Sequence, residues 1–248
     1  MLKYAVSIVL ALGCGNKEET GATVDQEVAK QKTALAPLIE KHRAATVKVL
    51  DGLHAIHKDA MAAATVTGQE PLAEGAKFDP VATLVAPVGW FGDVNWQEKT
   101  DSNDKDSLMF SASLRLRAPE LRRMLDTGVW NPSGGYALKS VEDAFRGVTR
   151  FQHAAVVRFH NYTPANIVGE KFAPASVSGD VIIYTLPAAK RVGAFPFEVV
   201  QTTEKVEVKR RESGTTALMA DLRDEIKKTV DAGLAAFAVG QAPDSPPM

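Results

Sequence analysis

The sequence predicts an α+β protein with a long N-terminal helix, an antiparallel β-meander and a C-terminal amphipathic helix that packs on the sheet. Apolar residues recur every three or four positions over 24–64 and again over 215–240, which is the period of a helix. They alternate over several short segments between 107 and 210, which is the period of a strand. Helices and strands come in separate runs, and this favours α+β over an alternating βαβ fold.

Composition sets the class of protein. The chain has 248 residues, 45% of them hydrophobic and 24% charged, with a formal net charge of −1. These values exclude wholesale disorder, a collagen and a coiled-coil fibre, and the near-neutral charge argues against a nucleic-acid partner. We expect one globular domain over residues 33–240 and a disordered, proline-rich tail over 241–248.

The first helix is expected from a stripe over 24–64. Pro37 interrupts the stripe, so the helix is expected to begin near residues 33–36 or to bend there. Residues 14–32 are polar and are expected to form a flexible tether, with a helical stalk as the alternative. The stripe consists of Val28, Leu35, Leu38, His42, Ala45, Val49, Leu53, Ile56 and Ala60.

The middle of the chain is predicted element by element. Residues 69–106 read as loop with short strands, and residues 107–116 alternate as a half-buried strand. A short helix is expected at 118–127. A second helix is expected to begin at Ser140, which with Asp143 resembles a capping box.

The meander is expected from three strands at 154–160, 179–186 and 192–201, with a continuation over 203–210. Pro196 has no amide hydrogen, so the third strand is predicted to lie at an edge or to carry a bulge. The last helix is expected to pack Leu218, Leu222 and Ile226 on one face of this sheet.

The N-terminus has the features of an export signal. Lys3 precedes an apolar run over Tyr4–Leu12, and Gly13 and Cys14 follow it. The run is too short to span a membrane as a helix, which needs about 20 residues, but it fits the apolar region of a signal peptide. Cys14 is the only cysteine, which suits an oxidising compartment.

The segment that ends at Cys14 resembles the lipobox of bacterial lipoproteins. The resemblance implies a signal peptide over 1–13, a diacylglyceryl group on the Cys14 thiol and an acylated amine on the same residue. It implies a lipid bilayer as partner and a place in the cell envelope. Gly15 rather than aspartate follows, which favours the outer membrane, facing the periplasm, over the inner membrane. The alternative is a cytoplasmic protein with an apolar N-terminus.

Four aromatic residues are candidates for ligand binding: Trp90, Phe91, Trp96 and Trp130. The first three lie in the loop-like stretch GWFGDVNW, and such rings can stack on a sugar or another flat ligand. Aromatic residues in a long loop also commonly fill the edge of a core, and we favour packing for these residues.

His54 and His57 are candidate metal ligands, because side chains three apart share one face of a helix. The alternative to metal binding is that these histidines form an exposed polar edge beside the apolar stripe. His153 and His160 are interpreted as residues at strand boundaries. Asp101, Asn103, Asp104 and Asp106 do not fit the spacing of a calcium-binding loop, and no cofactor is expected.

Three function classes follow. The sequence contains no GxSxG, Walker, GxGxxG or HExxH motif. We therefore favour a non-catalytic envelope lipoprotein that binds or scaffolds other envelope proteins or peptidoglycan. Thr100–Ser102 and Arg117 have a faint similarity to the peptidoglycan-binding motif of OmpA-like domains. The alternatives are a small-ligand or lipid carrier with an apolar cavity, and an enzyme with an unrecognised site.

Overall fold

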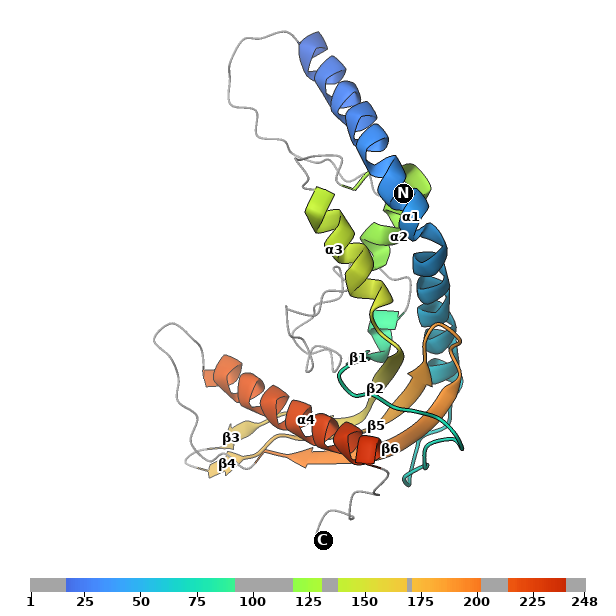
Figure 1. The fold of residues 1–248 in the computed structure, drawn as a ribbon. Helices are drawn as coiled ribbons and strands as arrows, with labels where there is room; N and C mark the ends of the chain where they lie inside the picture. Colours follow the sequence, from blue (N-terminus) through green and yellow to red (C-terminus); the bar gives the residue numbers. More distant parts are fainter. Residues whose placement is uncertain (1–16, 92–117, 131–137, 169–170, 202–213, 240–248) are drawn as a thin grey trace.

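A four-stranded sheet lies between two helical layers in the computed structural model, which describes residues 17–91, 118–130, 138–168, 171–201 and 214–239 (Figure 1). The α+β class is confirmed, with a long N-terminal helix, a mostly antiparallel sheet and a C-terminal helix. The elements are α1 (Lys17–Ala62), β1 (Thr83–Pro87), the 3-10 helix η1 (Val88–Phe91), α2 (Ala118–Thr127), α3 (Leu138–Thr149), β2 (His153–Thr163), β3 (Asn166–Val168), β4 (Lys171–Ala173), β5 (Ser176–Thr185), β6 (Arg191–Val200) and α4 (Gly214–Val239).

The sheet has the strand order β1-β2-β5-β6. Strands β2, β5 and β6 pair antiparallel as the expected meander, and β3 and β4 form a small hairpin between β2 and β5. Strand β1 adds a parallel partner to β2. Strand β6 lies at the end of the strand order and Pro196 is exposed on it, which confirms the prediction made from the missing amide hydrogen.

Helix α1 begins earlier than the sequence indicated. It is continuous from Lys17 through Pro37 to Ala62, so the expected start near 33–36 and the coil before it are wrong for residues 17–32. Pro37 is exposed, and its neighbours Leu35 and Ile39 are buried in the apolar core. Tertiary packing on both sides of the proline therefore offsets the one backbone hydrogen bond that it removes.

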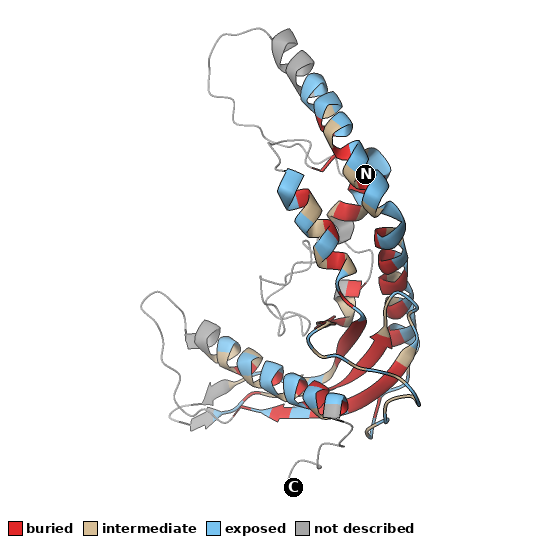
Figure 2. Ribbon diagram, viewed as in Figure 1, coloured by how far each residue is buried: buried red, intermediate tan, exposed pale blue. Residues whose placement is uncertain are grey.

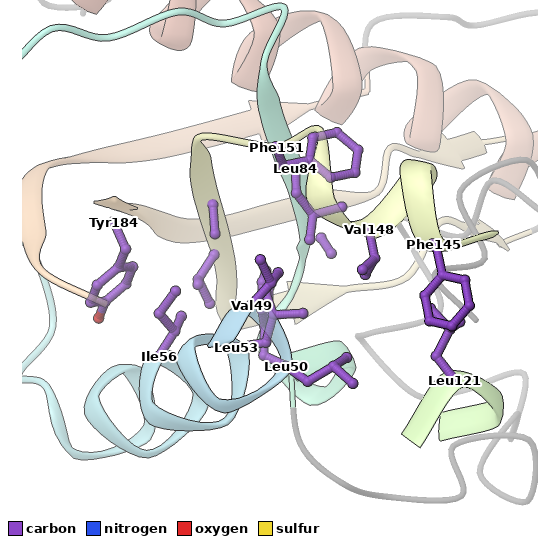
Figure 3. Packing of buried hydrophobic residues seen from close by; sticks show 14 of the residues in the cluster. Val49, Leu50, Leu53, Ile56, Leu84, Leu121, Phe145, Val148, Phe151 and Tyr184 are labelled. Carbon is purple, nitrogen blue, oxygen red and sulfur yellow. The ribbon is translucent and has the colours of Figure 1, made fainter. Parts of the chain in front are cut away.

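The first face of the sheet is covered by α1, α2 and α3. Ile56 of α1 lies beside Tyr184 of the sheet, and Leu121 of α2 lies beside Phe145 of α3 (Figure 3). All are buried, as the red stretch of α1 beside the sheet also shows (Figure 2). The first turns of α1 project beyond α2 and α3 (Figure 1).

The second face is covered by α4. Leu222 and Ile226 are fully buried against it, which confirms the expected packing of the last helix for these two residues, whereas Leu218 is half-buried and lies outside the cluster. Two close contacts bring helix and strand together. A Cβ atom on Gly233 of α4 would meet the Phe195 ring at 2.3 Å, and one on Gly193 of β6 would meet the Phe237 ring at 2.8 Å. Each glycine thus leaves room for an aromatic ring of the other element.

The other expected helices are found at α2 and α3, but α3 begins at Leu138, so Ser140 lies inside the helix and does not begin it. The strand expected over 107–116, the acidic residues between 101 and 106, the strand continuation at 203–210 and the tail at 241–248 lie outside the described residues, as does Cys14.

Candidate functional site: a buried charge cluster under α1

A buried ion pair joins the two central strands of the sheet. Arg158 of β2 and Asp180 of β5 lie opposite each other in the register, with exposed fractions of 8% and 0%. Arg158 Nε donates to Asp180 Oδ1 and Nη2 donates to Oδ2, both at 2.7 Å. This two-point geometry is the strongest that a guanidinium and a carboxylate form.

The same guanidinium holds the end of α1. Nη1 donates to the carbonyl oxygens of Ala60 and Ala63 at 2.9 and 2.6 Å, and Nη2 donates to that of Ala64 at 2.8 Å. The last carbonyls of a helix have no partner within the helix and carry partial negative charge. Arg158 therefore satisfies these carbonyls and ties the long helix to the sheet.

His160 completes the cluster from a β-bulge. The pairing of β2 with β5 shifts between Phe159 and Asn161, which leaves His160 as the additional residue. Its Nε2 lies 2.8 Å from Asp180 Oδ2. Gly179 allows the strands to approach here, because a Cβ atom on it would meet the Arg158 carbonyl oxygen at 2.1 Å. Bulges re-aim side chains in this way.

The cluster keeps the Asp180 carboxylate ionised. Burial by itself would raise the pKa of Asp180, but hydrogen bonds from Arg158, from the Val66 amide and from His160 outweigh it and hold the pKa below its ordinary value. The amide of Val66 donates to Oδ2 at 2.9 Å. The residues just beyond α1 are therefore fixed by the same carboxylate.

A second polar contact lies between α1 and β5. The hydroxyl of Tyr184, a fully buried residue, donates to Asp59 Oδ2 at 2.7 Å. Burial first, and then the Asp59 carboxylate, raises the pKa of Tyr184 well above its ordinary range. The phenol therefore remains a neutral donor, and the last turns of α1 are held at two points.

The arrangement is chemically that of a structural clasp. A carboxylate that orients an imidazole supplies two of the three members of a catalytic triad. Here, however, Arg158 engages both oxygens of Asp180, and its remaining donors are taken by carbonyls at and just beyond the end of α1. Only His160, whose side chain is 28% exposed, reaches towards solvent. We call Arg158, Asp180 and His160 the clasp.

The structure describes the side chains of two of the four aromatic candidates. Phe91 and Trp130 are core residues, with exposed fractions of 4% and 9%, so for these two packing is what the structure shows. The ring of Trp90 and all of Trp96 lie outside the described residues.

The histidine pair on α1 gains no third ligand. His57 Nδ1 lies 3.0 Å from the carbonyl oxygen of Val88, and His54 is half-buried one turn earlier. In the described part of the chain, no group of three or more His, Cys, Asp or Glu side chains could hold a metal ion. His57 thus contacts η1, instead of lying on an exposed polar edge.

Comparisons with protein-family models, with curated proteins and with solved structures give no match. Within the described ranges, no helix is both long and apolar enough to cross a bilayer.

The clasp was not identified from the sequence, where His160 was assigned to a strand boundary. The available signal was a charge of each sign inside an apolar strand: Arg158 in AAVVRFH and Asp180 in SGDVIIY. Charged residues that replace apolar ones in the middle of a strand are rarely buried unless they are paired.

Proposed function

We propose that this chain is a lipid-anchored lipoprotein of the bacterial cell envelope whose folded part is a non-catalytic binding or scaffolding module. The observation that supports the proposal best is the course of α1. It begins at Lys17, three residues after Cys14, and ends in the clasp on the sheet. A lipid on Cys14 would therefore be joined to the module by one helix.

A helical connection fixes the distance from the bilayer. At 1.5 Å per residue, the turns of α1 that precede the buried Gln31 extend about 21 Å. The first turns of α1 project beyond α2 and α3 (Figure 1). A module held in this way would stand away from the membrane surface, where it can reach other envelope proteins or peptidoglycan. Gly15 after the cysteine leads us to place the anchor in the outer membrane, facing the periplasm.

The packing of the described residues favours scaffolding over carriage of a small ligand. A carrier needs a cavity between the sheet and its helices. In the described part of the chain, both of these spaces hold close-packed apolar side chains, including Ile182 on one face and Ile183 on the other.

The anchor is tested by labelling with a fatty-acid probe. We expect wild type to take up the label and to fractionate with membranes, and Cys14→Ser to lose both properties. Asn16→Ser is the matched control, because it changes the same segment and retains the thiol. Equal labelling of wild type and Cys14→Ser would refute the anchor.

The helical stalk is tested by limited proteolysis of the folded protein. Trypsin should cut at Lys30 and Lys32 no faster than at Lys48 and Lys58, since all four lie in α1. Rapid cleavage at Lys30 and Lys32 alone would contradict the helical stalk and support the flexible tether.

A further inference from the structure

Residues 66–82, which we call the strap, lead from the end of α1 to β1 and pass along the outer edge of β6. The amide of Glu70 donates to the carbonyl of Ala194, and the amide of Ala73 donates to that of Val192, both at 2.8 Å. The Glu70 carboxylate pairs with Arg191. Strap side chains, Phe78 among them, pack against the apolar cluster under α4. The strap thus covers part of a sheet edge.

His153 lies beneath the strap. It is the first residue of β2 and is only 5% exposed. The Phe78 ring meets its ring edge-on at 5.2 Å between centroids, and the backbone of Lys77 hydrogen-bonds to it. Its Nδ1 is buried and has no hydrogen-bond partner among the described residues.

The groups around His153 suit a neutral ring. In the sheet register its neighbours are the uncharged Thr83 and Thr185. The strap contributes the Lys77 backbone and the carboxylate of Asp79, which also accepts the Val81 amide. Burial lowers the pKa of His153, and the Lys77 hydrogen bond and the Asp79 charge oppose this only in part.

Protonation and burial conflict at this position. A neutral imidazole has one acceptor nitrogen, and leaving it unpaired is a modest cost. A protonated ring carries a charge and two donors, and burying it with Nδ1 unpaired costs far more. A proton on His153 therefore favours any state in which the ring reaches water.

We propose that the strap is a proton-controlled cover: protonation of His153 releases residues 70–82 from the sheet and uncovers the edge of β6 at Val192 and Ala194. The strap is the element that can move, because partly buried side chains, a few backbone hydrogen bonds and one exposed ion pair hold it, whereas β2 is paired on both sides. An uncovered strand edge is a template for pairing with another strand.

The test is amide hydrogen exchange on the full chain at pH 7.5 and pH 5.5, expressed as protection factors so that the intrinsic pH effect cancels. In the open strap the ring should titrate near 6.5, so the open population should rise about tenfold between the two pH values. The amides of Glu70 and Ala73 should lose protection accordingly, while those in the centre of β5 should not.

Variants identify the group responsible. His153→Phe and His153→Gln cannot titrate in this range and should abolish the pH dependence. His42→Gln, in α1 and stacked on Phe145, should retain it. Unchanged protection in wild type at pH 5.5, or the same loss in both His153 variants, would overturn the proposal.

A wild-type measurement covers the case in which neither variant folds. The ring signals of His153, followed by NMR, should show protonation over the pH range in which the strap loses protection. A strap that opens while this ring stays neutral would equally refute the mechanism. The measurement uses no property of Cys14, so it succeeds or fails independently of the membrane anchor.

Discussion

On one face of the sheet α4 is held by aromatic rings seated on glycines, and on the other face α1 ends in a clasp of charged side chains. Phe195 rests on Gly233, and Phe237 rests on Gly193. At the end of α1 one guanidinium binds one carboxylate and three carbonyls, that of Ala60 in the helix and those of Ala63 and Ala64 just after it. The same sheet thus fixes two helices by different chemistry.

The difference follows from how each helix meets the sheet. Helix α4 presents a buried stripe from Leu222 to Phe237, so non-directional apolar burial is sufficient to hold it. Helix α1 extends well beyond the sheet and meets it near its C-terminal end (Figure 1). Hydrogen bonds are directional, so the clasp determines where that end lies. Helix α1 also packs against α2 and α3 through Leu35 and Ile39, and the clasp adds a directional contact where the helix meets the sheet.

The largest effect is expected from breaking the clasp. Arg158→Met leaves the Asp180 carboxylate buried without its cation, which should cost about 3–5 kcal/mol of unfolding free energy. Urea unfolding measures the loss. Adding Asp180→Leu removes the stranded charge, so the double variant should recover part of it. A double variant less stable than Arg158→Met would show that the carboxylate acts through other partners.

The apolar face should respond nearly as strongly. Leu222 is fully buried under α4, so Leu222→Ala should cost about 2–5 kcal/mol, from lost burial and the cavity that it leaves. A thermal melt measures it. Lys227→Ala, on the exposed side of the same helix, should change stability by no more than about 0.5 kcal/mol. Similar melting temperatures for the two variants would show that Leu222 of α4 does not contribute to the core.

The glycine contacts give a smaller effect with a matched control. Gly233→Ala brings a Cβ atom to 2.3 Å from the Phe195 ring, so overpacking should cost about 1–3 kcal/mol. Gly147→Ala, in α3, meets nothing within 4 Å and should stabilise by about 0.5 kcal/mol through helix propensity. Chemical denaturation of the two variants compares them directly. Equal shifts would mean that the ring moves aside freely.

The local elements could be predicted from the sequence because their periodicity is local. The stripe through Leu222 and Ile226 and the alternation in β5 each reflect neighbours a few residues apart. The parallel pairing of β1 with β2 joins Thr83 to His153, seventy residues away, and no local pattern encodes it. Pro37 shows the same limit, since packing of the flanking apolar residues overrides its local preference.

The site was harder to predict than the fold because its residues meet only through register. Arg158 and Asp180 face each other because β2 and β5 pair as they do, with a bulge at His160. Sequence reasoning about chemistry concentrated on aromatic and histidine clusters within single segments. Phe91 and Trp130 are instead part of the core. A more productive rule would have paired the opposite charges inside the two apolar strands.

Acid below about pH 4 should weaken the clasp and leave the apolar contacts of Leu222 unaffected. The pKa of Asp180 in the folded protein lies below its ordinary value of about 3.9, so the folded state binds fewer protons than the unfolded state near that value. The stabilisation is therefore fully present above the ordinary pKa and is lost as the pH falls from there through the folded pKa.

The pH dependence is measured as a difference between variants. The gap in unfolding free energy between wild type and Arg158→Met/Asp180→Leu should shift in favour of the double variant as the pH falls below about 4, because only wild type must protonate Asp180. The gap between wild type and Leu222→Ala should stay constant over the same range, since apolar burial takes up no proton. If the difference between wild type and the double variant also stays constant, the ionised Asp180 carboxylate does not stabilise the clasp. The two faces would then not differ in their chemistry.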